Sequence, residues 1–358
     1  MRRAAPLIIG AGPAGCAAAI MLARGGANPV VLEASRDCGD ALCGGFVSWR
    51  TMETLQLLGL SADQLGHRVT RLRLFAGHIS AEAALPRAAI GVSRRLLDSL
   101  LQKAAISAGA AIERGVAVRA LDDDVRLADA TSLSPETVMV ATGKHGLRGL
   151  ERVAAGEPAV GLRLRLPAHP GLQTIVGDSI ELHLFSQGYA GLVLQEDGSA
   201  NFCMAVRKDR LTETDGSPAK MLAKLCESNP ALGERLAYWD GNNKIDAIGA
   251  VPYGWIAGET NAGQFLLGDA AACIPSLAGE GNGLALASGV QAAAAWMSGD
   301  HGIGYQRAFA LRVRQPVHRA LRLWHLAERP LAARLAVRGV SIAPWLAALA
   351  ADLTRIDR

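Results

Sequence analysis

Short, unbroken apolar runs alternate with alanine-rich and amphipathic segments in the first part of the chain. Residues 7–9 and 30–32 are two such runs, and a glycine-rich turn and an alanine-rich segment separate them. Runs of this length without polar residues are typical of strands buried in a parallel sheet. The pattern therefore predicts a strand–helix–strand unit at the start of an α/β domain.

Amphipathic helices and further short strands extend this domain. Helices are expected over 48–60 and 93–109, with Ser48 and Ser93 as their N-caps. Further strands of the same sheet are expected at 111–113, 116–118, 138–140 and 264–267. Because the last of these lies far along the chain, the domain is predicted to be discontinuous.

Alternation of apolar and polar residues replaces this pattern in the middle of the chain. It recurs at 161–166, 179–185, 190–194, 201–206 and 247–251, and earlier at 68–75, with a companion strand through 89–92. A period of two residues is typical of half-buried strands. We therefore expect a mostly antiparallel sheet domain inserted into the first domain, with one helix at 218–226.

The predicted architecture is α/β, with a Rossmann-like nucleotide-binding domain, an inserted substrate domain and a C-terminal helical region. The nucleotide-binding domain is expected to comprise 1–67, 93–155 and 262–300, the substrate domain 68–92 and 156–261, and the helical region 301–358.

The helical region carries ten arginines, no lysine and three acids. Apolar residues keep helical spacing at Phe309, Val313, Val317, Leu321 and Trp324. This spacing favours helices that face the core and present a solvated basic side. A face that contacts a membrane surface and the wall of an apolar substrate tunnel are the alternatives.

Composition and charge exclude several classes of protein. Half of the 358 residues are apolar, only 4% are aromatic, and the net charge is +4. No lysine- and arginine-rich run contains interleaved aromatic residues, so we expect no nucleic-acid binding. The start of the chain lacks the features of a signal peptide, and the most apolar stretch, 283–297, reads as a buried helix. We therefore expect a cytoplasmic protein with reduced cysteines and no metal site.

The turn after the first strand carries the strongest chemical signal. Gly10, Gly12 and Gly15 form G-x-G-x-x-G, in which the three glycines allow a tight turn, approach to a pyrophosphate and close helix packing. Pro13 and Ala14 begin a helix whose N-terminal N–H groups favour phosphate. Glu33, followed by Ala34, ends the second strand, where a carboxylate can accept the hydroxyls of an adenosine ribose. This pattern predicts binding of FAD or NAD.

Two later segments extend the predicted site. Ala141, Thr142 and Gly143 follow a short strand, where α/β sheets bind ligands. Gly268 and Asp269 follow another strand, and a second glycine-rich stretch then leads into a long helix near Gly281 and Asn282.

In their order, these motifs resemble those of the geranylgeranyl-reductase-like FAD-dependent oxidoreductases, which share the fold of the para-hydroxybenzoate-hydroxylase-type monooxygenases. The resemblance covers roughly residues 1–300. It implies FAD as the cofactor, bound at its pyrophosphate by the glycines of the first turn and at its ribose by Glu33. It further implies that the residues near the cofactor include Cys43, Gly44, Gly45, Arg94, Val118, Asp269, Gly281 and Asn282.

The resemblance leaves the reaction open. The reductase signature Tyr-x-Trp-x-Phe-Pro is absent, and Gly188-Tyr189-Ala190-Gly191-Leu192-Val193 stands in its place. The overall pattern is similar to that of flavin-dependent oxidoreductases found beside aromatic-polyketide pathways. The resemblance thus favours a monooxygenase that hydroxylates an apolar aromatic or polyketide-type substrate through a flavin hydroperoxide. A reductase acting on an isoprenoid or polyene is the alternative, and a flavin protein that only transfers electrons is a third.

Electron supply and catalytic residues are less defined by the sequence. No second glycine fingerprint is present, so we expect NAD(P)H to dock transiently or a separate reductase to deliver electrons. Lys144, His145 and Tyr189 are candidate acid–base groups, although a structural role is favoured for each. Peripheral membrane contact through the C-terminal helices is a further expectation.

Overall fold

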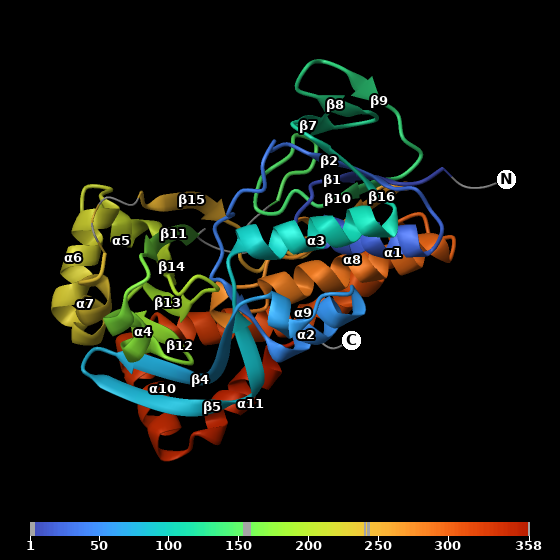
Figure 1. Ribbon diagram of the computed structural model, residues 1–358. Helices are drawn as coiled ribbons and strands as arrows, with labels where there is room; N and C mark the ends of the chain where they lie inside the picture. The colour runs from blue at the N-terminus through green and yellow to red at the C-terminus, as the bar shows by residue number, and fades with distance from the viewer. Residues whose placement is uncertain (1–3, 153–158, 240, 242–243, 357–358) are drawn as a thin grey trace.

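The computed structural model describes residues 4–152, 159–239, 241 and 244–356 of the chain (Figure 1). Two main sheets and a set of C-terminal helices confirm the predicted α/β fold class. The expected domain boundary at 155/156 lies outside the described residues. The other domain limits stay predictions, and the sheets are described here by the strands that form them.

The first sheet is parallel, and it contains the predicted βαβ unit. Its strand order is β16 (Gln264–Leu266), β10 (Val138–Val140), β1 (Leu7–Ile9), β2 (Val30–Glu33) and β6 (Ala111–Arg114). Every neighbouring pair in this sheet is parallel. The carboxyl ends of β1, β2, β10 and β16 therefore meet at one edge, where such sheets bind ligands.

Three helices pack together beside this sheet. They are α1 (Pro13–Arg24), α3 (Arg94–Ala108) and α8 (Gly281–Met297), and α1 contacts both of the others. Helix α8 is buried along much of its length, as its apolar sequence predicts. Ser93 caps α3 by accepting a hydrogen bond from the Leu96 N–H, and Ser48 caps α2 (Trp49–Leu57) in the same way from Thr51. Both predicted N-caps are thus confirmed.

One predicted strand of this sheet is wrong. The segment 116–118 does not continue the parallel sheet, because the chain turns away after β6. Val118 instead begins a separate three-stranded antiparallel sheet of β7 (Val118–Leu121), β8 (Val125–Leu127) and β9 (Ser132–Leu133). The short apolar run is compatible with either sheet, and only the pairing partner decides between them.

The second sheet has eight strands and is antiparallel except between β12 and β4. Its order is β15 (Asp246–Val251), β11 (Ala159–Leu166), β14 (Ala200–Arg207), β13 (Gly188–Leu194), β12 (Ser179–Phe185), β4 (His67–Ala76), β5 (Ile79–Gly91) and β3 (Phe46–Val47). The predicted early alternation at 68–75 therefore joins the later strands, although nearly a hundred residues separate them in the sequence.

Helices cover both faces of the second sheet. One face packs against α4 (Pro170–Val176), α6 (Pro218–Ser228) and α7 (Pro230–Leu236), and α5 (Lys208–Thr212) follows β14. The other face packs against α9 (Ile303–Ala327), α10 (Pro330–Ile342) and α11 (Trp345–Leu353). Short 3-10 turns occur at η1 (Ala62–Gln64), η2 (Gly268–Ala270) and η3 (Ser276–Ala278).

The apolar spacing that predicts a core-facing helix is confirmed in α9. Phe309, Val313, Val317 and Trp324 are all buried. In Figure 1, α10 and α11 lie beside β4 and β5, at the end of the molecule opposite the three-stranded sheet. They thus close the second sheet on the face that does not carry α4, α6 and α7.

A buried charge cluster stabilises the second sheet. Arg235 of α7 donates two hydrogen bonds of 3.0 Å to the carboxylate of Glu181, and His183 Nε2 lies 3.3 Å from the same carboxylate. Burial by itself raises the pKa of Glu181. The hydrogen bonds from His183 and Arg235 outweigh this effect, so that the pKa lies below its ordinary value.

Glu181→Gln is expected to lower the free energy of unfolding by about 1.5–3 kcal/mol at neutral pH, because it removes the buried counter-charge of Arg235 and leaves only the exposed Glu234 as its ion-pair partner. Since the pKa of Glu181 is lowered on folding, its stabilisation is present above the ordinary glutamate pKa and is lost as the pH falls through the folded value. The difference from wild type should therefore be constant from pH 7 to about pH 5 and shrink in more acidic buffer.

Urea unfolding at several pH values measures this difference. Glu213→Gln, which removes an exposed carboxylate paired with Arg210, is the matched control and should cost about 0–1 kcal/mol. Equal losses in the two variants would contradict the assigned role of Glu181.

Candidate functional site

A cavity of about 1440 Å³ joins the two main sheets and the C-terminal helices. Its volume exceeds the roughly 300–1,000 Å³ of common ligand pockets, so it has room for a large cofactor together with a second molecule. It runs from the carboxyl edge of the parallel sheet, past the Cys43 loop, to residues of α9, α10 and α11. The two ends of the cavity differ in chemistry.

The glycine turn forms the wall at the first end. Gly10 has a φ of +103°, and a Cβ there would lie 2.5 Å from the Ala141 carbonyl oxygen, so only glycine fits. A Cβ on Gly15 would collide with the Gly10 carbonyl, which confirms its expected role in close packing of helix and strand. Gly12 is different, because only the Arg94 guanidinium, at 3.5 Å, lies near its Cβ position. Its backbone is open to the cavity.

Helix α1 begins at this open backbone and has no side-chain cap. The N–H groups of its first turn therefore face the cavity with the positive end of the helix dipole. Arg94 adds a full charge beside them, oriented by hydrogen bonds of 2.9 and 2.8 Å to Asp98. Burial raises the pKa of Asp98 although Arg94 counteracts it. The arrangement favours an anion such as a phosphate.

Glu33 lies at the end of β2, where the sequence places a ribose-binding carboxylate. Its Oε2 accepts a hydrogen bond of 2.8 Å from the Ala11 N–H, and its Oε1 accepts one of 2.9 Å from the Ser35 N–H. These bonds fix the carboxylate at the cavity wall. Its remaining lone pairs can accept hydroxyl groups.

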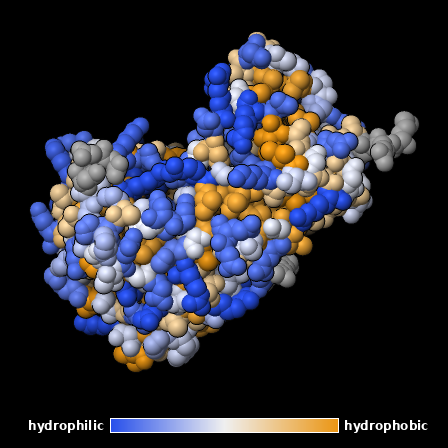
Figure 2. All heavy atoms as spheres, viewed as in Figure 1, coloured by the Kyte–Doolittle hydropathy of each residue, from blue (hydrophilic) through white to orange (hydrophobic). Residues whose placement is uncertain are grey.

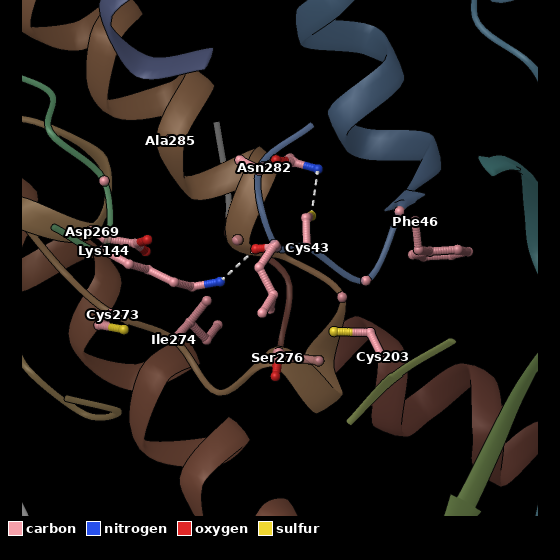
Figure 3. A pocket seen from close by; sticks show the side chains of 18 of the residues that line it. Cys43, Phe46, Lys144, Cys203, Asp269, Cys273, Ile274, Ser276, Asn282 and Ala285 are labelled. Carbon is pink, nitrogen blue, oxygen red and sulfur yellow. Dashed lines mark hydrogen bonds between the residues drawn. The ribbon is translucent and has the colours of Figure 1, made fainter. Parts of the chain in front are cut away.

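A second helix begins at the same cavity. Glu280 precedes α8, which has no side-chain cap, and nothing lies within 4 Å of a Cβ on Gly281. Asn282, in the first turn, directs its amide toward the Cys43 sulfur at 3.7 Å (Figure 3). Arg355, near the C-terminus, forms a buried ion pair with Glu280 and hydrogen bonds to the Ala278 carbonyl. The start of α8 is thereby held in place from both sides.

A buried cation lies between the loops that follow β10 and β16. Lys144 Nζ donates a hydrogen bond of 3.1 Å to the Leu42 carbonyl and approaches the Cys43 loop from a different side than Asn282 (Figure 3). Burial lowers the pKa of Lys144, but the surrounding groups, Asp269 first among them, together outweigh burial and raise the pKa above its ordinary value. Lys144 is therefore charged at neutral pH, and it is a poor general base.

Arg152 fixes these two loops together. Its guanidinium donates to the carbonyls of Gly143 and Lys144 at 2.8 Å each and to that of Asp269 at 3.2 Å. Arg152 therefore connects the two predicted segments, Ala141–Gly143 and Gly268–Asp269. No sequence motif includes this arginine.

Hydroxyl groups form a neutral polar cluster deeper in the cavity. Ser276 hydrogen bonds to the phenols of Tyr189 and Tyr253. Burial raises the pKa of Tyr253 to about 12 and that of the nearby Cys203 thiol to about 12, and it raises the pKa of Tyr189 well above its usual range. These groups stay protonated at neutral pH, so they can hold a polar substrate group by hydrogen bonds.

Apolar side chains line the other end of the cavity. The sheet contributes Leu72, Leu74, Leu182 and Leu184, and the helices contribute residues that include Ala320, Ala333, Gly339, Val340 and Ala347. We call this end the apolar arm. Small residues on the helices leave it open, so it fits an elongated apolar group. The tunnel-wall alternative for the C-terminal helices thus agrees with the geometry.

The structure brings nearly all predicted site residues to one cavity. Those that line it are Gly10, Gly12, Pro13, Ala14, Glu33, Ala34, Cys43, Gly44, Gly45, Arg94, Val118, Ala141, Thr142, Gly143, Gly268, Asp269, Gly281 and Asn282. Gly15 lies behind the wall. Val118 reaches the cavity although its strand belongs to the three-stranded sheet. Sequence reasoning missed Arg152, Tyr253 and Ser276, which have no motif around them, and it named no residue of the apolar arm.

Comparisons with known proteins agree with this geometry. Residues 3–142 match the model of a family described as FAD binding domain. A menaquinone reductase of Mycobacterium tuberculosis is 27% identical over 316 residues, which cover 80% of this chain and 75% of the relative.

Solved structures with the same fold include two flavoproteins. PqsL of Pseudomonas aeruginosa, in complex with 2-aminobenzoylacetate, aligns with a TM-score of 0.74 and 18% identity, covering 94% of this chain and all of that one. The flavin-dependent brominase Bmp2 aligns with a TM-score of 0.77 and 15% identity, covering 99% of this chain and 93% of the other.

The fold and the match to the domain model define a flavoprotein with the fold of the FAD-dependent monooxygenases. The chain is an FAD-dependent oxidoreductase. No helix among the described residues is long and apolar enough to cross a bilayer. Nor does that part of the chain hold three His, Cys, Asp or Glu side chains grouped to bind a metal ion.

Gly12→Val is expected to weaken FAD binding by at least about 100-fold, because the new side chain fills the space where a pyrophosphate approaches the backbone. The backbone angles of Gly12 suit any residue, so the variant should fold. Fluorescence titration with FAD measures the affinity, and circular dichroism checks the fold.

Gly15→Val is the contrasting variant, since its side chain would collide with Gly10 and should impair folding itself. Unchanged FAD affinity in a folded Gly12→Val protein would show that the pyrophosphate binds elsewhere.

Proposed function

We propose that this oxidoreductase is a monooxygenase that hydroxylates an apolar aromatic compound. The observation that carries the proposal is the cavity itself, because a neutral hydroxyl cluster at Ser276 is followed by a long apolar arm. A phenol with an apolar substituent fits both parts of the cavity, because its hydroxyl group suits the hydroxyl cluster and its substituent suits the apolar arm. The fold shared with PqsL, which was solved with an aromatic ligand, supports the aromatic part of the proposal.

The residues present fit FAD. The open backbone at Gly12, the uncapped start of α1 and Arg94 would hold the pyrophosphate, and Glu33 would hold the adenosine ribose. The start of α8 at Gly281 and Asn282 would face the electron-poor edge of the flavin ring, where N–H groups stabilise negative charge. Val118, Asp269 and the Cys43–Gly45 loop, which also line the cavity, complete the expected cradle.

When bound and reduced, FAD supplies the activation of oxygen. The protein positions the substrate and excludes water from the site. The apolar arm excludes water and fixes the carbon skeleton of the substrate. The hydroxyl group of the substrate exchanges hydrogen bonds with Ser276, Tyr189 and Tyr253. Because these three groups stay protonated, they do not remove the proton of the substrate. Electrons come from transiently docked NAD(P)H or from a separate reductase.

The experiment is a labelling reaction. Reduced holoprotein is mixed with a long-chain phenol under ¹⁸O₂, and mass spectrometry of the product is expected to show one labelled oxygen. A product without label, or reoxidation of the flavin by the substrate under anaerobic conditions, would overturn the monooxygenase proposal.

A reductase is the second candidate, and one observation favours it. The curated relatives that match most of the chain carry the name menaquinone reductase, and the apolar arm could hold a polyene or isoprenoid chain. In this form the protein would resemble the geranylgeranyl reductases and transfer hydride to a carbon centre. Anaerobic flavin reoxidation by such a substrate would establish it. The large cavity argues against a flavin protein that only transfers electrons.

Gly339→Leu tests the role of the apolar arm. Gly339 lies within α10 at the cavity, and a Cβ there would be 3.6 Å from Leu346. A leucine would project into the arm and should lower kcat/KM for long-chain phenols about 10-fold or more, with little effect on short phenols. Its melting temperature should not fall, because leucine favours a helix over glycine.

Gly339→Ala is the graded control, since a single methyl group fits the available space. Steady-state kinetics with a series of chain lengths gives the comparison. An equal loss for short and long substrates would mean that the arm does not hold the chain.

A further inference from the structure

The two last helices expose an unusual share of large apolar side chains. Twelve such residues are exposed in the described part of the chain, and six of them lie in α10 and α11. They are Leu331 (75% exposed), Leu335 (68%), Ile342 (86%), Trp345 (64%), Leu349 (47%) and Leu353 (41%). We call these six residues the C-terminal apolar face. In Figure 2, apolar atoms gather at the lower tip of the molecule, where the C-terminal helices lie in Figure 1.

The spacing of these residues makes a stripe on each helix. Leu331, Leu335 and Ile342 are four and seven residues apart, which places them on one side of α10. Trp345, Leu349 and Leu353 are four residues apart and share one side of α11. The opposite sides of both helices are buried, at Val337 and Ala347 among others. Each helix therefore has two apolar sides, one packed against the protein and one that faces outward.

Positive charge accompanies the stripe on α10. Arg334 and Arg338 are exposed one turn apart beside Leu331, Leu335 and Ile342. Within the described residues neither arginine forms a salt bridge, and Asp352 is the single acid between residues 330 and 353. An apolar stripe flanked by arginines is complementary to a lipid surface that carries anionic headgroups. Tryptophan, as at residue 345, is also favoured where hydrocarbon meets water.

The C-terminal apolar face is continuous with the cavity. Leu326, Leu335 and Ala336 are exposed, and all three also line the apolar arm. The arm therefore reaches the surface at α10. A second protein seated on this face would cover that opening, whereas a bilayer would place it against hydrocarbon. An apolar molecule could then enter the arm from the bilayer without passing through water.

We propose that the C-terminal apolar face docks the protein on an anionic lipid surface. The docking does not depend on which reaction the flavin performs, so it stands or falls separately from the proposed monooxygenase activity. The contact is peripheral, with apolar side chains of α10 and α11 in the headgroup region and Arg334 and Arg338 near the phosphates.

Vesicle sedimentation of the FAD-loaded protein tests the proposal without any substrate. The holoprotein is expected to bind vesicles of mixed phosphatidylcholine and phosphatidylglycerol, and to bind pure phosphatidylcholine vesicles at least about 10-fold more weakly. Added salt should weaken only the binding to the anionic vesicles.

Two double variants separate the apolar and electrostatic contributions. Leu331→Gln with Ile342→Gln should weaken binding about 10-fold or more on anionic vesicles. Arg334→Gln with Arg338→Gln should also lose about 10-fold and remove most of the salt dependence. Ile106→Gln and Lys103→Gln, at exposed positions on α3, are the matched controls and should bind like wild type.

Three results would overturn the proposal. One is failure of the wild-type holoprotein to sediment with either vesicle. The second is equal loss in the α3 controls, which would show that the effect is not specific to this face. The third is a dimer in light scattering that Leu331→Gln with Ile342→Gln abolishes while vesicle binding stays unchanged, because the occupant would then be a second copy of the chain.

Discussion

Helix α1 packs so closely against its neighbours that the contact points can hold only glycine. The geometry of the cavity depends on this close packing. A Cβ at Gly15 would collide with the Gly10 carbonyl, and one at Gly289 of α8 would collide with the Ala14 carbonyl. Several alanines of both helices lie in the core around this contact. Because α1 and α8 are this close and both begin at the cavity, two helix dipoles converge on it.

Local signals in the sequence were enough to predict which residues line the cavity around the glycine turn. The glycine turn, the strand that ends at Glu33 and the caps Ser48 and Ser93 each depend on residues a few positions apart. Their geometry is set by short-range sterics and hydrogen bonds, so the sequence pattern carries it. The alternating strands were also predictable, because one buried face imposes a period of two on each.

Pairing and long-range contacts could not be predicted in the same way. The segment at 116–118 has a strand-like composition, but nothing local tells which sheet it joins. Arg152 acts through backbone carbonyls, which every residue possesses, and so leaves no pattern. Ser276 meets Tyr189 and Tyr253 only after two sheets and a helix turn have come together. The apolar arm combines small residues of three helices whose spacing also suits an ordinary core.

The ion pair between Glu280 and Arg355 links the C-terminal end of the described chain to α8, the helix that begins at the cavity. Both side chains are buried, and Arg355 also lies over the ring of Trp49. If proteases trimmed the chain to a point before Arg355, the buried carboxyl group of Glu280 at the start of α8 would lose its ion-pair partner. Flavin content would then fall although every glycine of the cradle is intact. The yellow colour of a preparation thus reports on whether the segment that carries Arg355 is intact.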